Sequence, residues 1–243
     1  MIIFKNLILI LNYHIMKSLA SLLIIGLMFT SSFAQNPVNS GNARDGLKVT
    51  RENLKGTPFI IESWVTGYGI SSNGNKTNTM MLNYDIYGDQ LVYKDDSGQV
   101  MSMVDTDLSG FVITTLDGVQ IFAKTQQFEF KNGNTPDMAY VNVYDGAARN
   151  ILVEHFKELD DPNLSGWSSS KNNTLNAEYK AKMNVYVVNP EGTYEKIKLK
   201  NKSLLSIYND HPKLKNFLKN NKINTLNDLD QAFKYINANL AKK

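Results

Sequence analysis

Residues 111–124 read FVITTLDGVQIFAK, and this stretch decides the fold. Two apolar runs, Phe111–Leu116 and Val119–Lys124, flank Asp117-Gly118, a dipeptide that favours tight hairpin turns. Both runs are rich in β-branched and aromatic residues, which pack well on a pleated sheet. The stretch therefore predicts a β-hairpin, and the segments on either side of it can be compared with the same pattern.

The pattern recurs from residue 56 to residue 200. Short apolar runs with a period of two alternate with turn sequences, which is typical of antiparallel β-structure. Further hairpins are predicted around Lys94–Gly98, Asp145-Gly146 and Asn189–Gly192. We therefore expect a mainly β (α+β) fold, with the sheet arranged as an antiparallel meander, a sandwich or an open barrel.

The sequence makes specific predictions for two strands of this β domain. The first strand is predicted at Phe59–Val65, where apolar residues dominate. The strand Tyr179–Val188 alternates strictly, with one set at Tyr179, Ala181, Met183, Val185 and Val187 and the other at Lys180, Lys182, Asn184 and Tyr186. Because side chains alternate across a strand, the first set is expected in the core and the second in solvent.

Residues 201–243 form a basic tail for which about three helices are predicted. A short helix is expected at Asn201–Tyr208, and a second at His211–Asn220 with Asp210 as its cap. A third is capped by Thr225 and carries one apolar stripe, made of Leu226, Leu229, Phe233, Ile236 and Leu240. Either the second helix and the β domain cover that stripe, or a partner does.

The N-terminal residues predict export. Lys17, an apolar run and the small residues Ser32 and Ala34 follow the layout of a signal peptide, so residues 1–34 are expected to be removed, with Met16 as an alternative start. No transmembrane segment is expected after cleavage, and a polar, flexible entry segment is expected at residues 35–55. The chain has no cysteine, so we expect a periplasmic or extracellular protein rather than a lipoprotein.

Charge is distributed unevenly along the chain. From Lys196 onward there are eleven lysines against three acids, Asp210, Asp228 and Asp230. The candidate partner surface comprises Lys213, Lys215, Lys219 and Lys222, which would suit an anionic component of the cell envelope. The alternative is that these lysines help the tail to dock on the acidic β domain, or simply solvate it. Nucleic acid is not expected, because the tail has no arginine.

Metal and cofactor sites are not expected. His155 lies in a predicted strand and His211 beside a helix cap, and neither has a second histidine at ligand spacing. Asp105 and Asp107 resemble the opening of a calcium loop, but Leu116 stands where the bidentate glutamate is required. No nucleophile elbow, phosphate loop or zinc-protease motif occurs.

These observations favour an exported, non-enzymatic binding or structural module of the envelope. One alternative is a hydrolase of envelope polysaccharide or peptide that uses Asp85, Asp89, Asp95 and Asp96 around one hairpin. Another is a carrier whose sheet curves around an apolar ligand. No catalytic residue is assigned from the sequence.

Several short stretches resemble a group of uncharacterised exported proteins of Bacteroidetes-type bacteria. The residues that carry the resemblance are Gly56–Phe59, Leu82–Leu91, Lys202–Leu205, Asn220–Ile223 and Tyr235–Asn237. The resemblance spans most of the mature chain. It implies an exported β domain with a helical tail, and it implies no catalytic residues.

Overall fold

The computed structural model describes residues 54–104, 107–161 and 177–240. The predicted signal peptide, the entry segment up to residue 53 and Asp105 lie outside these ranges, as does most of the loop between Asp160 and Ala177. Within the described ranges, no helix has the length and apolar character needed to cross a membrane.

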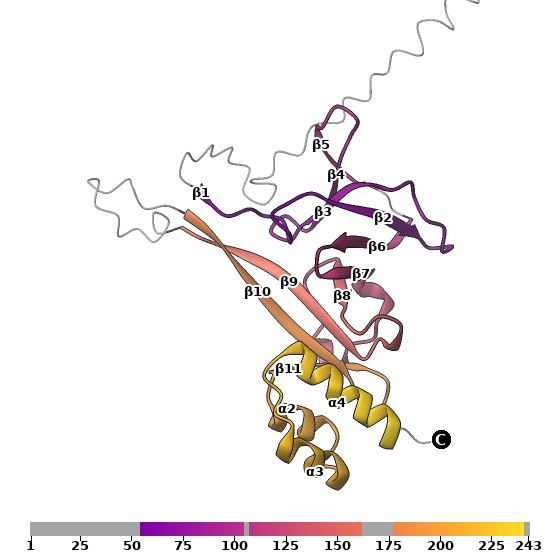
Figure 1. The fold of residues 1–243 in the computed structure, drawn as a ribbon, viewed down its shortest axis with the longest axis vertical. Helices are drawn as coiled ribbons and strands as arrows, with labels where there is room; N and C mark the ends of the chain where they lie inside the picture. Colours follow the sequence, from indigo (N-terminus) through magenta and orange to yellow (C-terminus); the bar gives the residue numbers. More distant parts are fainter. Residues whose placement is uncertain (1–53, 105–106, 162–176, 241–243) are drawn as a thin grey trace, which may run out of the picture. The chain divides into compact units, whose positions relative to one another are not determined.

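Among the described residues, one mixed sheet of eleven strands is followed by three α-helices, which confirms the predicted mainly β (α+β) fold (Figure 1). The strands are β1 (Leu54–Lys55), β2 (Val65–Ser71), β3 (Met80–Asp85), β4 (Gln90–Lys94), β5 (Val100–Ser102), β6 (Leu108–Thr115), β7 (Gly118–Lys124), β8 (Tyr140–Val143), β9 (Ile151–Asp160), β10 (Ala177–Val188) and β11 (Tyr194–Ile197). The helices are α2 (Asn201–Ile207), α3 (Pro212–Asn220) and α4 (Leu226–Asn239).

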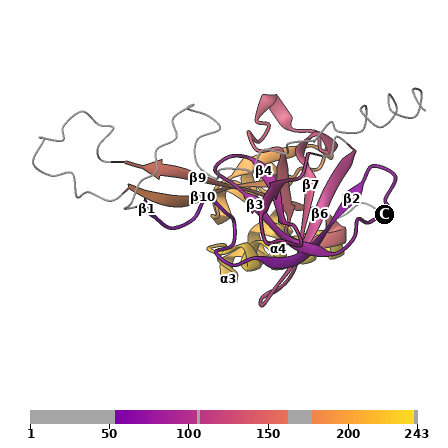
Figure 2. The same cartoon turned by 90° about the horizontal axis from the view of Figure 1, so that it is seen from above.

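The strand order is β1-β10-β9-β8-β7-β6-β2-β3-β4-β5, and β11 also pairs with β10. All of these pairings are antiparallel except that of β1 with β10. Figure 2 shows one end of β9 and β10 projecting beyond the other strands, with β1 beside β10. Strand β10 therefore has different neighbours along its length.

The sheet curls, so that the turn after β3 meets β9. The backbone N–H of Lys157 donates to the carbonyl of Ile86 at 3.2 Å, and the N–H of Ala139 donates to the Asp89 carboxylate at 3.0 Å. The sheet is therefore curled, although its strand order runs from β1 to β5 without a closing pair among the described residues. Its interior is filled by aromatic rings rather than left hollow, as the stacking of Phe111 on Phe122 at 4.6 Å illustrates.

The predicted hairpins occur at the expected places. Strands β6 and β7 pair from Gly110 with Ala123 to Thr115 with Gly118, so the turn residues are Leu116 and Asp117. Gly118 follows them with a φ of 122°, a conformation that glycine adopts readily. The hairpin predictions for β4 with β5, β8 with β9 and β10 with β11 are also confirmed.

The predicted strand at Phe59–Val65 is wrong, because β2 begins only at Val65. The preceding residues instead cross the sheet above Asn83. The Asn83 side-chain amide donates to the carbonyls of Ile61 and Ser63 at 2.8 and 3.2 Å. At the start of the run, Phe59 forms an isolated antiparallel bridge with Asp85, and Ile60 N–H donates to the carbonyl of Tyr84 at 2.8 Å. The apolar run is thus held by one short bridge and by the Asn83 side chain rather than by a continuous strand ladder, which its hydrophobicity alone does not reveal.

The expected two-sided pattern of Tyr179–Val188 holds only in part. Ala181 and Met183 are exposed although they share a face with buried Val185, and Tyr186 is buried although its face was expected in solvent. Tyr186 packs against Phe130, with ring centroids 5.4 Å apart, because the segment before β8 covers that face. Alternation therefore gives the two faces correctly, whereas burial depends on what covers each face.

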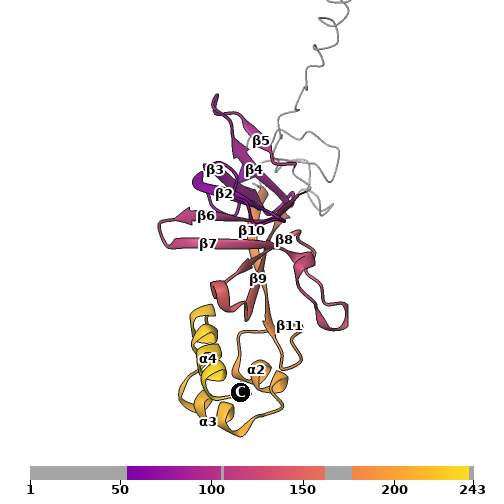
Figure 3. The same ribbon diagram turned by 90° about the vertical axis from the view of Figure 1, so that its right-hand side faces the viewer.

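The apolar stripe of α4 is covered by the rest of the protein. Leu229, Phe233 and Ile236 are buried in a cluster with residues of α3, β9 and β10. Figure 3 shows the three helices gathered at the end of β9 and β10 that carries β11. The tail is therefore docked by apolar contact.

Helix capping follows the prediction in one case and departs from it in the other. Thr225 caps α4, and its hydroxyl accepts from the N–H of Asp228 at 3.1 Å in a reciprocal capping box. Asp210 does not cap α3, because its backbone is left-handed with a φ of 51° and His211 takes the cap position. The turn formed by Asn209 and Asp210 thus directs the chain into Pro212, the first helical residue.

Candidate functional site

The four lysines of the candidate surface all lie on or just after α3, and all are exposed. Leu214 and Leu218 anchor the opposite side of this helix in the core. Lys215 and Lys219 are four residues apart, so their side chains neighbour each other on the helix surface. The amphipathic pattern of α3 thus turns its positive charges outward.

Two of the three acids of the tail, Asp228 and Asp230, do not pair with the lysines of this surface. The Asp228 carboxylate accepts from the N–H groups of Asn224 and Thr225 at 3.0 and 2.9 Å, and these bonds lower its pKa. Asp230 pairs with Lys234 one turn further along α4, at 2.7 Å. Both carboxylates are therefore used within their own helix.

The structure gives no support to the alternative that the tail docks through charge. Among the described residues, the ion pair of Lys234 with Asp230 is the only one that involves a lysine beyond Ile197. The contact with β9 and β10 is made by Ile151, Val153, Val185 and Val187. The lysines of α3 are thus left to face solvent.

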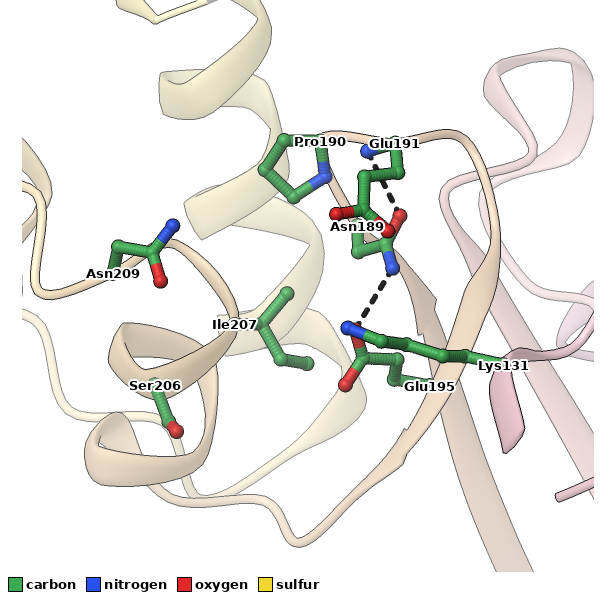
Figure 4. A pocket seen from close by; sticks show the side chains of 8 residues that line it. All are labelled: Lys131, Asn189, Pro190, Glu191, Glu195, Ser206, Ile207 and Asn209. Carbon is green, nitrogen blue, oxygen red and sulfur yellow. Dashed lines mark hydrogen bonds and ion pairs between the residues drawn. The ribbon is translucent and has the colours of Figure 1, made fainter.

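A polar hollow of about 310 Å³ lies where the turn between β10 and β11 meets α2 (Figure 4). The Glu195 carboxylate accepts from Lys131 Nζ at 2.9 Å and from Asn189 Nδ2 at 2.8 Å. These bonds, that from Asn189 first, hold the pKa of Glu195 below its ordinary value. Residues lining the hollow are Lys131, Asn189, Pro190, Glu191, Glu195, Ser206, Ile207 and Asn209.

The sequence analysis did not single out this hollow. Lys131 and Glu195 are 64 residues apart in the chain, and no motif links them. A second, more open hollow of about 530 Å³ shares Glu195, Ser206 and Ile207 with the first. The carboxylate, amide and ammonium groups are already bonded to one another, so the arrangement stabilises the junction of β11 and α2.

The acidic residues of the hairpin alternative are divided between two turns. Asp85 ends β3 and Asp89 lies in the turn that follows it, whereas Asp95 and Asp96 follow β4 at its other end. Asp85 Oδ1 accepts from the N–H groups of Tyr87 and Gly88 at 3.0 and 2.7 Å. The four carboxylates are therefore not brought together around one point.

Each of these turns uses a carboxylate to hold its backbone. Burial raises the pKa of Asp85 above its ordinary value. Asp95 accepts from the side chain of Ser97 and the N–H of Gln99 at 2.7 and 2.8 Å, and these bonds lower its pKa. Asp89 accepts from the hydroxyl of Tyr84 as well as from Ala139. Each bond has a structural role in shaping the hairpin.

The two histidines of the described chain lie far apart in the fold. His155 in β9 lies beside Phe122, with ring centroids 6.5 Å apart, and burial lowers its pKa to about 4. His211 is the cap residue of α3, and its Nδ1 is buried with no hydrogen-bond partner in the described structure. No group of three or more metal-ligating side chains occurs among the described residues.

A buried carboxylate that the sequence analysis missed is Glu154 in β9. Its Oε1 accepts from the N–H groups of Asp137 and Met138 at 2.7 and 3.2 Å. Its Oε2 accepts from Asn184 and the hydroxyl of Tyr186 at 2.7 and 3.0 Å. With four donors around one charge, Glu154 joins β9 and β10 to the segment before β8.

Comparison of this chain with protein-family models, curated proteins and solved structures finds no match. The function is therefore argued from the geometry of its own residues.

Proposed function

We propose that this protein is an exported, non-enzymatic binding module of the bacterial cell envelope. In this proposal, Lys213, Lys215, Lys219 and Lys222 bind an anionic envelope component. The observation that carries the proposal is the exposure of all four lysines, three on α3 and Lys222 just after it, while the other face of this helix is anchored in the core. A positive surface held on a rigid helix attracts an anionic partner without a folding step.

The signal-peptide pattern of residues 17–34 supports the location, since it predicts delivery to the compartment in which envelope polymers and lipid headgroups are found. The arrangement of the acidic hairpin residues does not favour the hydrolase alternative. The carrier alternative requires space inside the curled sheet, and Tyr84, Phe111, Phe122 and Tyr140 pack ring against ring there.

The test replaces the four lysines together with glutamine and measures binding to phosphatidylglycerol vesicles and to purified anionic envelope polysaccharide. Each lysine near an anionic surface contributes about 1 kcal/mol, so we expect binding to weaken by at least about a hundredfold at low salt. Binding of the unmodified protein should also fall as salt rises, because exposed charges are screened.

The matched control changes charge by the same amount on the β domain, with glutamine at Lys76, Lys94, Lys180 and Lys182. These positions lie on β10 or near β2 to β4, outside the lysine surface of the tail. We therefore expect the control variant to bind both probes nearly as well as the unmodified protein. Equal binding by the tail variant and the unmodified protein would rule out the lysine surface.

A further inference from the structure

One edge of β10 is paired only at its two ends. Strand β1 pairs with Ala177 and Glu178, and β11 pairs with Val185–Val188. Between them, from Tyr179 to Asn184, β10 pairs only with β9 on its other side among the described residues. Figure 1 shows β1 beside one end of β10 and β11 beside the other. At about 3.3 Å per residue, the open edge is roughly 20 Å long.

The hydrogen bonds between β10 and β9 determine which backbone groups of β10 point into this opening. Val188 N–H donates to the carbonyl of Asn150 in the β9 direction at 3.0 Å, and the register from Val187 back to Glu178 has no break. Because backbone groups alternate between the two sides of an antiparallel strand, those of Lys180, Lys182 and Asn184 point toward β9. Those of Ala181 and Met183 point into the opening.

Two further hydrogen bonds confirm this assignment. Lys157, the partner of Ala181 in β9, donates its N–H away from β10 to Ile86. Asn189 lies an even number of residues after Ala181, so the backbone groups of both residues point to the same side of the strand. The N–H of Asn189 donates to the carbonyl of Thr193 on the β11 side at 2.8 Å. Ala181 and Met183 thus offer two N–H donors and two carbonyl acceptors to the opening.

The side chains from Lys180 to Met183 beside the opening are all exposed. Ala181 and Met183 are exposed on one face of β10, and the exposed fraction of Met183 is 46%. On the other face, Lys180 and Lys182 form ion pairs with Asp160 and Glu158 of β9. Their charges are thus paired with acids of the neighbouring strand β9, whereas unpaired lysines protect the edges of many sheets.

The charges at the two ends of the opening differ. At the β1 end, exposed Lys55 lies opposite exposed Glu178. At the β11 end, Lys198 and Lys200 are exposed, and no acid of the described chain forms an ion pair with either. The opening therefore suits a strand whose end beside β11 is acidic.

We propose that the open edge of β10 is a β-augmentation site for an extended peptide segment of another protein, with acidic residues lying beside Lys198 and Lys200. Ala181 and Met183 form the main-chain hydrogen bonds, as in other cases of strand addition. The site is separate from the lysine surface of α3 and does not depend on it.

A second copy of this chain does not fit the opening. Antiparallel pairing of two β10 edges around Lys182 would place this lysine opposite its counterpart, and like charges directly opposite each other are destabilising. The strands β1 and β11 of each copy would also meet at the ends. A single extended peptide avoids both conflicts.

The test uses the full mature chain and a fluorescein-labelled peptide with two glutamates at each end and alternating valine and threonine between them. Binding is measured by fluorescence anisotropy, with a peptide carrying lysines in place of the glutamates as the control. We expect the acidic peptide to bind at least about tenfold more tightly, and this preference to shrink in the variant with Lys198→Gln and Lys200→Gln. Equal binding of both peptides, or no binding, would overturn the proposal.

Backbone participation is tested by Met183→Pro. Proline is tolerated on an edge strand where the lost N–H faces away from the ladder, so the β9 pairing should survive while the peptide loses a donor. We expect peptide affinity to fall at least about tenfold, with the far-ultraviolet circular dichroism unchanged. The four-lysine variant of α3 serves as the control and should bind the peptide normally.

Hydrogen exchange provides a readout that requires no substitution. In the free protein, the amides of Ala181 and Met183 should exchange quickly and those of Lys180 and Lys182 slowly. Adding the acidic peptide should slow the first pair and leave the second unchanged. Slow exchange of Ala181 and Met183 in the free protein, or no change on peptide addition, would show that the edge is not an open binding site.

Discussion

The two halves of β10 share one alternating sequence but differ in their surroundings. Val185 and Val187 are buried under the helices, whereas Met183, on the same face, is 46% exposed. The segment Val185–Val187 pairs with strands on both sides, whereas among the described residues Tyr179–Asn184 pairs only with β9. The comparison shows that a regular pattern can serve as core in one half of a strand and as an accessible edge in the other.

The largest expected effect concerns the buried half. Phe233→Ala removes a fully buried ring from the cluster that covers Val185 and Val187, and we expect the free energy of unfolding to fall by about 4 kcal/mol. Urea denaturation followed by circular dichroism measures this loss. A loss below about 1 kcal/mol would mean that the helices contribute little to holding this half of β10.

The second prediction concerns pH and His155, which lies opposite Met183 in the β9–β10 ladder. Its pKa of about 4 in the folded protein is below the ordinary value of 6.5, so the unfolded chain binds the proton more readily. This contribution to stability is fully present above pH 6.5 and is lost as the pH falls toward 4. We expect a loss of about 3 kcal/mol across this range.

Other groups also titrate in acid, so the measurement is the difference between the unmodified protein and His155→Gln. Urea denaturation at pH 7, 5.5 and 4 should show the two stabilities converging, or crossing, as the pH falls. Parallel curves would mean that His155 is not shielded from water in the folded protein.

The smallest effect is expected in the exposed half of β10. Met183→Ala removes a side chain that belongs to none of the apolar clusters of the described residues, and we expect stability to change by less than about 0.5 kcal/mol. Thermal unfolding compared with Phe233→Ala measures the contrast. A loss near that of Phe233→Ala would show that Met183 is covered in solution.

Much of the fold follows from local patterns. The hairpins at Leu116-Asp117 and Asn189–Gly192 and the cap at Thr225 are encoded by residues close together in the chain, so their chemistry is visible in the sequence. The outward direction of the lysines on α3 follows in the same way from helical periodicity. The strand predicted at Phe59–Val65 was wrong because only Phe59 bridges to β3, at Asp85, and the carbonyls of Ile61 and Ser63 are bound by the Asn83 side chain, well separated in the chain.

The sequence by itself determined the β-rich domain, the change to helical period near residue 200 and the positive charge of the tail. Tertiary structure decided that Glu154 is surrounded by four donors, that the acids of the hairpin separate, and that β10 has an open edge. The physical reason is that periodicity and turn chemistry act between near neighbours in the chain. Burial and edge pairing depend on segments such as β1, β10 and β11, which meet only after the sheet has formed.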